Sequence, residues 1–180
     1  MAHIDKELLM TKARNIRLLA VDVDGVLTDG SIVYTSQGEQ VQSFHVHDGL
    51  GLKLLDLAGI HVAILSSRSS HALAVRAEEL GIKLVYQGLS DKIEVYEEIK
   101  EKLGIDDKEV AYMGDDWVDL PLLQKAGLAV VVADAAQSME DYADYVTRQA
   151  GGRGAVREVC ELILKAQNKR GKFLDHYLNS

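Results

Sequence analysis

The sequence is poor in the residues that make cross-links, chain breaks and membrane spans. Its 180 residues include one cysteine, Cys160, which excludes an internal disulfide and any metal site built from several thiolates. One proline excludes a proline-rich linker. No apolar run reaches the roughly 18 residues of a membrane helix. We therefore expect a single domain over residues 1–180, long enough to bury its core without staples.

Positive charge is scarce as well. The chain has 20 Lys and Arg against 28 Asp and Glu, which gives a formal net charge of −8. Nucleic acids and anionic membranes bind to basic surfaces, so we expect neither as a partner. The first six residues lack the basic, apolar and small-residue regions of a signal peptide. These features predict a cytoplasmic protein.

Short apolar, β-branched runs alternate with amphipathic runs along the chain. Such alternation is typical of a parallel sheet covered by helices, so we expect a doubly wound, Rossmann-like α/β fold. The expected strands are residues 18–23, 60–65, 84–86, 110–113, 128–132 and 145–146. The expected helices are residues 49–58, 70–80, 91–103, 120–126, 136–142 and 155–167.

Two segments depart from this alternation. Residues 32–34 and 41–46 look like strands around a polar turn, which predicts a β-hairpin insert at about residues 31–47. Because the insert follows the first strand, it belongs at the carboxyl edge of the sheet, where open α/β folds bind ligands. About residues 151–180 form the last helix and a tail, and the polar tail 168–180 should be loosely held.

Carboxylates follow two of the expected strands. Asp22 and Asp24 end the first strand, and Asp115, Asp116 and Asp119 follow the fourth. Buried carboxylates are costly unless they are paired or bound to a metal, and oxygen ligands favour Mg²⁺. The alternative is structural. Asp-Gly turns explain the first group and helix capping explains Asp119, but neither explains Asp115.

Two other strand ends carry polar side chains. Ser66 and Arg68 follow the second strand, and Lys92 opens the helix after the third. A helix N-terminus is a poor place for a cation, so Lys92 suggests a negative partner there. Taken singly, Ser66 is equally compatible with a capping serine and Lys92 with a solvated surface lysine.

These elements, in this order at four strand ends, resemble the phosphatases of the haloacid dehalogenase (HAD) superfamily. The resemblance rests on Asp-x-Asp-Gly-Val at residues 22–26, Ser66, Lys92 and Gly-Asp-Asp-x-x-Asp at residues 114–119. It implies the HAD fold, with a hairpin insert after the first strand and no separate cap domain.

Longer stretches narrow the resemblance. Residues 24–30, 44–51, 86–88 and 151–158 are similar to the superfamily members that act on 3-deoxy-D-manno-octulosonate (KDO) 8-phosphate, and the similarity covers about residues 12–167. It implies Mg²⁺-dependent hydrolysis of KDO 8-phosphate in lipopolysaccharide precursor synthesis. It also implies a homo-oligomer, expected to be a tetramer, in which neighbouring copies complete the site.

The resemblance assigns roles to the strand-end residues. Asp22 is the implied nucleophile, which becomes an aspartyl phosphate, and Asp24 is the implied general acid and base. Mg²⁺ would be held by Asp22, the backbone carbonyl of Asp24, and Asp115. Ser66 and Lys92 would hold the phosphoryl oxygens.

Substrate recognition is assigned more broadly. A phosphate dianion and two carboxylates exceed the charge of Mg²⁺ and Lys92, so further cations are expected at the site. Arg157 is one candidate, beside a glycine-rich turn at residues 151–154 that fits either an anion-binding site or a hinge. The expected substrate-binding residues are Thr28, Arg68, Asp48, Gly49 and Arg153, and the supporting acidic residues are Asp116 and Asp119.

Two departures from the usual pattern leave the exact substrate open. His47 and Ser67 stand where relatives usually carry arginine and glycine. A related sugar acid phosphate, such as a nonulosonate 9-phosphate, is therefore the nearest alternative. A phospho-accepting receiver and a catalytically inactive scaffold are more distant ones. His45 and His47 alternate on an expected strand and would share one face of it.

Overall fold

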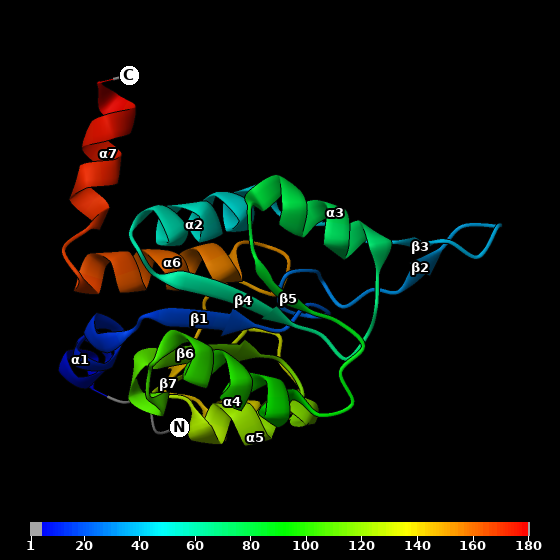
Figure 1. Cartoon of the computed structure of the whole chain (residues 1–180), viewed down its shortest axis with the longest axis horizontal. Helices are drawn as coiled ribbons and strands as arrows, with labels where there is room; N and C mark the ends of the chain where they lie inside the picture. The colour runs from blue at the N-terminus through cyan, green and yellow to red at the C-terminus, as the bar shows by residue number, and fades with distance from the viewer. Residues whose placement is uncertain (1–4, 180) are drawn as a thin grey trace.

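The computed structural model describes residues 5–179 and contains a six-stranded sheet. All its strand pairs are parallel, and the order is β5-β4-β1-β6-β7-β8 (Figure 1). This order, with β1 between β4 and β6, confirms the predicted doubly wound α/β fold. The strands are β1 (Leu18–Val21), β4 (His61–Leu65), β5 (Leu84–Tyr86), β6 (Val110–Gly114), β7 (Leu128–Val131) and β8 (Tyr145–Val146).

Helices form a layer on each face of the sheet. They are α1 (Lys6–Asn15), α2 (Val46–Leu57), α3 (His71–Leu80), α4 (Lys92–Leu103), α5 (Leu120–Lys125), α6 (Ala155–Ala166) and α7 (Arg170–Leu178). In Figure 1, α2, α3 and α6 cover one face, and α4 and α5 cover the other.

The two layers enclose two separate apolar cores, because alternate side chains of a strand point to opposite faces. Leu19 and Val21 of β1 belong to the core beneath α2 and α6. Leu18 and Ala20 belong to the core beneath α4 and α5. All four side chains are fully buried, so β1 is fixed from both sides up to the residue before Asp22.

The predicted insert is a two-stranded antiparallel hairpin, β2 (Val33–Tyr34) and β3 (Gln40–Val41). It projects beyond the carboxyl ends of the sheet strands (Figure 1). The second strand is shorter than expected: it ends at Val41, and α2 begins at Val46. His45 caps this helix through its Nδ1, which accepts a hydrogen bond from the backbone N–H of His47 at 3.3 Å. The prediction that both histidines share a strand face was therefore wrong.

Three other segments differ from expectation. The helix predicted at residues 136–142 is a single 3₁₀ turn, Met139–Tyr142. α1 was not predicted. The tail expected to be loosely held contains α7, where Phe173 packs against the core and the preceding Lys169 Nζ donates to the carbonyl of Ala58 at 2.8 Å. The end of the tail, residue 180, and residues 1–4 of the N-terminal segment lie outside the described residues.

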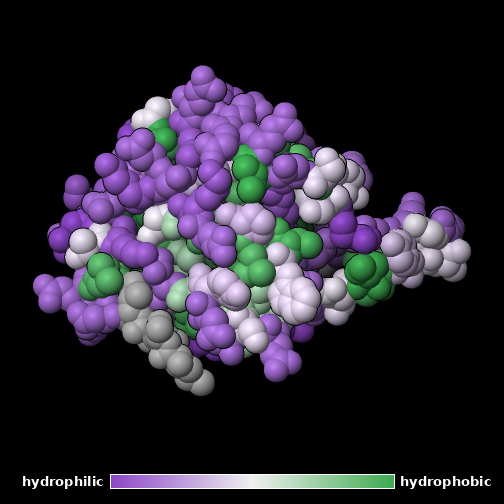
Figure 2. Space-filling view, turned by 90° about the horizontal axis from the view of Figure 1, so that it is seen from below, coloured by the Kyte–Doolittle hydropathy of each residue, from purple (hydrophilic) through white to green (hydrophobic). Residues whose placement is uncertain are grey.

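The surface is mainly polar on the side of α4 and α5. Figure 2 shows this face, on which hydrophobic residues form small scattered spots around its centre and near the projecting hairpin. Among the described residues, no helix combines the length and the apolar character that crossing a membrane requires.

Candidate active site

The parallel sheet brings the predicted residues together at its carboxyl edge. Asp22 follows β1, Ser66 follows β4 and Asp115 follows β6, and β1 pairs with both of the other strands. Lys92 is the first residue of α4, which follows β5 beside β4. The fold therefore gathers four segments that are far apart in the sequence.

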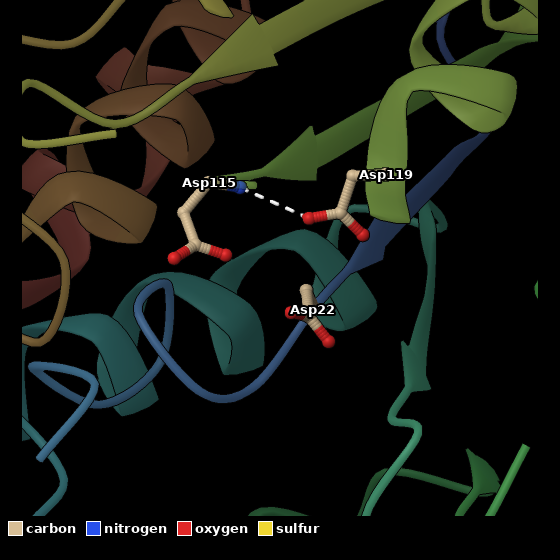
Figure 3. A group of neighbouring side chains, drawn as sticks. All are labelled: Asp22, Asp115 and Asp119. Carbon is tan, nitrogen blue, oxygen red and sulfur yellow. Dashed lines mark hydrogen bonds between the residues drawn. The ribbon is translucent and has the colours of Figure 1, made fainter. Parts of the chain in front are cut away.

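Three carboxylates surround one small space at this edge (Figure 3). Asp22, Asp115 and Asp119 each offer an oxygen, and these oxygens lie within 4.8 Å of one another. The Asp115 carboxylate lies against Gly25, where an added Cβ would fall 2.0 Å from Oδ2. Gly25 also has φ +88°, so glycine is required there both by conformation and by space.

A buried network of ion pairs and hydrogen bonds holds the carboxylate cluster in place. Lys92 Nζ lies 2.8 Å from Asp22 Oδ1 and 2.7 Å from Asp119 Oδ1. The hydroxyl of Tyr112 donates to the same Asp119 oxygen at 2.6 Å. Asp119 and Tyr112 are fully buried, and Lys92 is 7% exposed. Sequence reasoning missed Tyr112, because it lies in an apolar strand and nothing marks its hydroxyl as part of a polar network.

The carboxylates of Asp119 and Asp116 bind backbone N–H groups of the loop that follows β6. Asp119 Oδ2 accepts from the backbone N–H groups of Asp115 at 3.0 Å and Asp116 at 3.4 Å. Asp116 caps the following 3₁₀ turn by accepting from the N–H of Trp117 at 2.7 Å. The residue that caps with its side chain is therefore Asp116, whereas the sequence predicted Asp119. Asp119 makes no side-chain cap to α5, although Pro121 does lie in its first turn.

The cluster carries excess negative charge. Burial and the nearby Asp119 carboxylate raise the pKa of Asp22 to about 6, although Lys92 opposes the shift. Burial, followed by the charges of Asp22 and Asp119, raises the pKa of Asp115 to about 7. Burial alone would lower the pKa of Lys92, but the two carboxylates outweigh it and raise that pKa. A further cation would relieve this repulsion.

The donor set fits magnesium. Asp22 and Asp115 provide hard carboxylate oxygens at one point, the ligand type that Mg²⁺ prefers. The oxygens of Asp119 already accept from Lys92, Tyr112 and the loop backbone, which suits Asp119 to orienting its neighbours. The predicted ligands Asp22 and Asp115 could thus bind the metal ion. Asp119 instead orients Lys92, Tyr112 and the loop backbone.

Asp24 lies in a different environment from Asp22. Its side chain is 23% exposed, and its Oδ2 lies 3.6 Å from the Nε of Arg68. Its Oδ1 accepts from the Nε2 of Gln42 at 3.2 Å. Arg68 also donates to the hydroxyl of Tyr34 in β2 at 3.3 Å. In the insert region, Gln42 thus contacts Asp24 directly, and Tyr34 contacts it only through Arg68. Neither residue was identified from the sequence.

Ser66 lies at the same edge. It is 2% exposed, and its Oγ accepts from the N–H of Arg68 at 3.2 Å, which leaves the hydroxyl hydrogen free to donate. Its backbone pairs with Tyr86 and Leu89 of the neighbouring strand and loop. Ser67, one of the departures from the usual pattern, is exposed.

The glycine-rich turn braces the loop after Asp22. An added Cβ at Gly151 would lie 1.7 Å from the carbonyl oxygen of Gly25, and the N–H of Gly152 donates to the carbonyl of Val26 at 2.9 Å. Close backbone packing explains these glycines better than the hinge interpretation. Arg153 pairs with Asp29 at 3.2 Å and is two-thirds exposed.

Three predicted substrate-binding residues do not reach the carboxylate cluster. The buried Thr28 donates its hydroxyl to the carbonyl of Val23 at 3.3 Å and so braces the loop. The buried Asp48 accepts from the N–H groups of Gly154 and Arg157, so it caps α6. Gly49 permits α2 to pack against Arg76 of α3. All three residues therefore make contacts that support the loop or the packing of the helices.

Comparison with known proteins agrees with this geometry. A family model for haloacid dehalogenase-like hydrolases matches residues 84–159. The 3-deoxy-D-manno-octulosonate 8-phosphate phosphatase KdsC of Escherichia coli (strain B / BL21-DE3) is 50% identical over 161 residues, which are 89% of this chain and 86% of that protein.

Solved structures agree as well. The 3-deoxy-D-manno-octulosonate 8-phosphate phosphatase of Yersinia pestis matches with a TM-score of 0.89 and 48% identity, over 91% of this chain and 88% of that one. The Moraxella catarrhalis phosphatase, in complex with a magnesium ion, a phosphate ion and a KDO molecule, matches with a TM-score of 0.93 and 44% identity, over 96% and 99%. The chain therefore belongs to the haloacid dehalogenase-like hydrolases, in the family of the 3-deoxy-D-manno-octulosonate 8-phosphate phosphatases.

Proposed function

We propose that this chain is a Mg²⁺-dependent phosphatase that hydrolyses KDO 8-phosphate to KDO and inorganic phosphate, in lipopolysaccharide precursor synthesis. The observation that carries the proposal is the meeting of Asp22, Asp115 and Lys92 at one sheet edge, in a chain half identical to a KDO 8-phosphate phosphatase. Because the chain belongs to this family, the alternative that it is a phospho-accepting receiver is rejected.

The first proposed step transfers the phosphoryl group to the protein. An oxygen of Asp22 forms a bond to phosphorus while the bond to the sugar oxygen breaks in line with it. Asp24 gives its proton to the departing oxygen, because an alkoxide is a poor leaving group. The Ser66 hydroxyl and the Lys92 ammonium bind the phosphoryl oxygens while the charge on those oxygens changes.

The second step releases phosphate. Asp24, now a carboxylate, takes a proton from water as the water oxygen bonds to phosphorus, and the bond to Asp22 breaks. We propose that Asp22, Asp115 and the backbone carbonyl of Asp24 hold Mg²⁺, which would reduce the repulsion between the phosphate and the nucleophile. Asp119 keeps Lys92 and the Asp115 loop in place.

Steady-state kinetics on a panel of phosphates tests this proposal. With Mg²⁺ present, we expect the highest kcat/KM for KDO 8-phosphate. We expect this activity to be lost when Mg²⁺ is removed by a chelator. A nonulosonate 9-phosphate and p-nitrophenyl phosphate belong in the panel, because His47 and Ser67 depart from the usual pattern. If KDO 8-phosphate were no better than the aryl phosphate, the substrate assignment would fall.

We further propose that the chain is one phosphatase domain, acts in the cytoplasm and forms a tetramer whose neighbouring copies cover the site. The hairpin supports the last point, because four apolar side chains at it, Ile32, Val33, Tyr34 and Val41, are about half exposed. Sedimentation of the wild type and of Val33→Asp tests it. A monomeric wild type with full activity would contradict the shared site.

A further inference from the structure

Both oxygens of the Asp24 carboxylate are contacted by side chains from outside the catalytic motif. Gln42, in the segment between β3 and α2, donates its Nε2 to Oδ1 at 3.2 Å. Arg68, after β4, approaches Oδ2 at 3.6 Å and is itself bonded to Tyr34 of the hairpin. The carboxylate is therefore contacted from two sides, one of which belongs to the insert.

The side-chain amide of Gln42 has one bonded polar atom and one that is buried without a partner among the described residues. Its Oε1 is buried and accepts no hydrogen bond from residues 5–179, whereas its Nε2 bonds to Asp24. A buried polar atom without a partner is destabilising, so an apolar residue of similar size would suit the fold at least as well. Within the described residues, the hydrogen bond that the Gln42 amide makes is thus the one to Asp24.

We propose that Gln42 is a positioning residue for Asp24, and that the insert thereby sets the direction of proton transfer to the leaving group. The bond to Oδ1 restrains rotation of the carboxyl, while Arg68 restrains its other oxygen. This inference rests on the proposed role of Asp24 as general acid. It gives the hairpin segment a part in the chemistry as well as in covering the site.

Leaving-group chemistry separates positioning from a structural role. A sugar alkoxide needs a proton as it departs, whereas p-nitrophenolate departs readily without one. Loss of positioning should therefore reduce kcat/KM for the sugar phosphate much more than for the aryl phosphate. The parameter kcat/KM is the right one, because it reports the steps up to departure of the leaving group and not the later hydrolysis.

The test compares Gln42→Leu with Gln37→Leu, in the native assembly with Mg²⁺. Gln37 carries the same side chain at the exposed hairpin turn, so its variant controls for loss of a glutamine from the insert. For Gln42→Leu we expect kcat/KM to fall about 10- to 100-fold on KDO 8-phosphate and less than about 3-fold on p-nitrophenyl phosphate. The thermal midpoint should stay unchanged or rise. Gln37→Leu should behave as wild type.

Other outcomes overturn the inference. An equal fall on both substrates, or a fall accompanied by a lower thermal midpoint, would mean that Gln42 supports the fold. Unchanged kinetics would mean that Asp24 needs no such partner. Failure of the proposed function is distinguishable, because it would appear in the wild type as weak turnover of KDO 8-phosphate. Any alkyl phosphate that the wild type then hydrolyses would still serve for the comparison with the aryl phosphate.

Discussion

Asp22 and Asp24 are two residues apart in one loop, yet their surroundings differ. Asp22 is 7% exposed and pairs with the buried Lys92 at 2.8 Å. Asp24 is about a quarter exposed, and its contacts with Gln42 and Arg68 are longer, at 3.2 and 3.6 Å. The first carboxylate is held by the sheet and its core helices. The second is held by Gln42 of the insert region and by Arg68, which follows β4.

This difference separates stability from chemistry. Changes around Asp22 remove charge partners from a buried network, so they should alter both folding and activity. Changes around Asp24 affect a partly exposed group with weak contacts, so they should alter activity alone. The four predictions below test this division.

The largest effect is expected for Asp22→Asn. An amide cannot act as the nucleophile, so kcat/KM should fall by more than about 10³-fold on every phosphate. The protein should still fold, because the amide oxygen can accept from Lys92, but its unfolding free energy should change because a charge partner of Lys92 is lost. Kinetics and circular dichroism on one preparation check this. Substantial activity in Asp22→Asn would show that another group attacks phosphorus.

Lys92→Met should affect the fold most. It leaves Asp22 and Asp119 buried without their cation, which costs about 3–5 kcal/mol of unfolding free energy. Urea unfolding measures the loss. Adding Asp119→Asn should recover part of it, because one uncompensated charge disappears. An additive double variant would show that the two residues are not coupled.

Asp24→Asn should separate the two regions most clearly. We expect kcat/KM on KDO 8-phosphate to fall about 10²-fold or more, with a smaller fall on p-nitrophenyl phosphate, because the general acid is lost. The unfolding free energy should change by less than about 0.5 kcal/mol, since the side chain is partly exposed. A large loss of stability would place Asp24 in the structural network with Asp22.

The smallest effect is a pH dependence of metal stabilisation. The pKa values of Asp22 and Asp115 are raised to about 6 and about 7, so the folded protein binds protons more tightly than the unfolded chain. Their contribution to stability is present below about pH 4 and is lost as the pH rises through 6 to 7. Mg²⁺ favours the charged carboxylates. Calorimetry should therefore show a larger Mg²⁺-induced rise in Tm at pH 8 than at pH 5. Equal shifts at both pH values would contradict the raised pKa values.

Much of the sheet could be predicted, because buried parallel strands read as apolar runs. The strand expected at residues 110–113 is β6, and the helix expected at residues 91–103 is α4 with Asp91 as its cap. The short strands of the insert were harder to predict. There the capping by His45 starts a helix inside an apparent strand, a local hydrogen bond that periodicity does not reveal.

The part of the site at the strand ends could be predicted from the sequence. Asp22, Ser66, Lys92 and Asp115 were found from their places at the ends of expected strands and from the family resemblance, and the fold brings them to one edge. Thr28, close to the first motif, braces the loop with its hydroxyl, and Asp48, in the first turn of α2, caps α6 with its carboxylate. Their partners, such as the N–H of Gly154, are set by tertiary structure and carry no mark in the sequence.

The packing of Gly151 and Gly152 on the loop of residues 25–28 has a consequence for the nascent chain. A ribosome-bound chain that has reached residue 120 already contains every residue proposed to act in catalysis. The loop that follows the nucleophile nevertheless lacks the backbone that closes over it, because the bond between Gly152 and Val26 spans more than a hundred residues. Contacts of such sequence separation form late and slow folding. We therefore expect catalytic competence to be the last property that the chain acquires as it is synthesised.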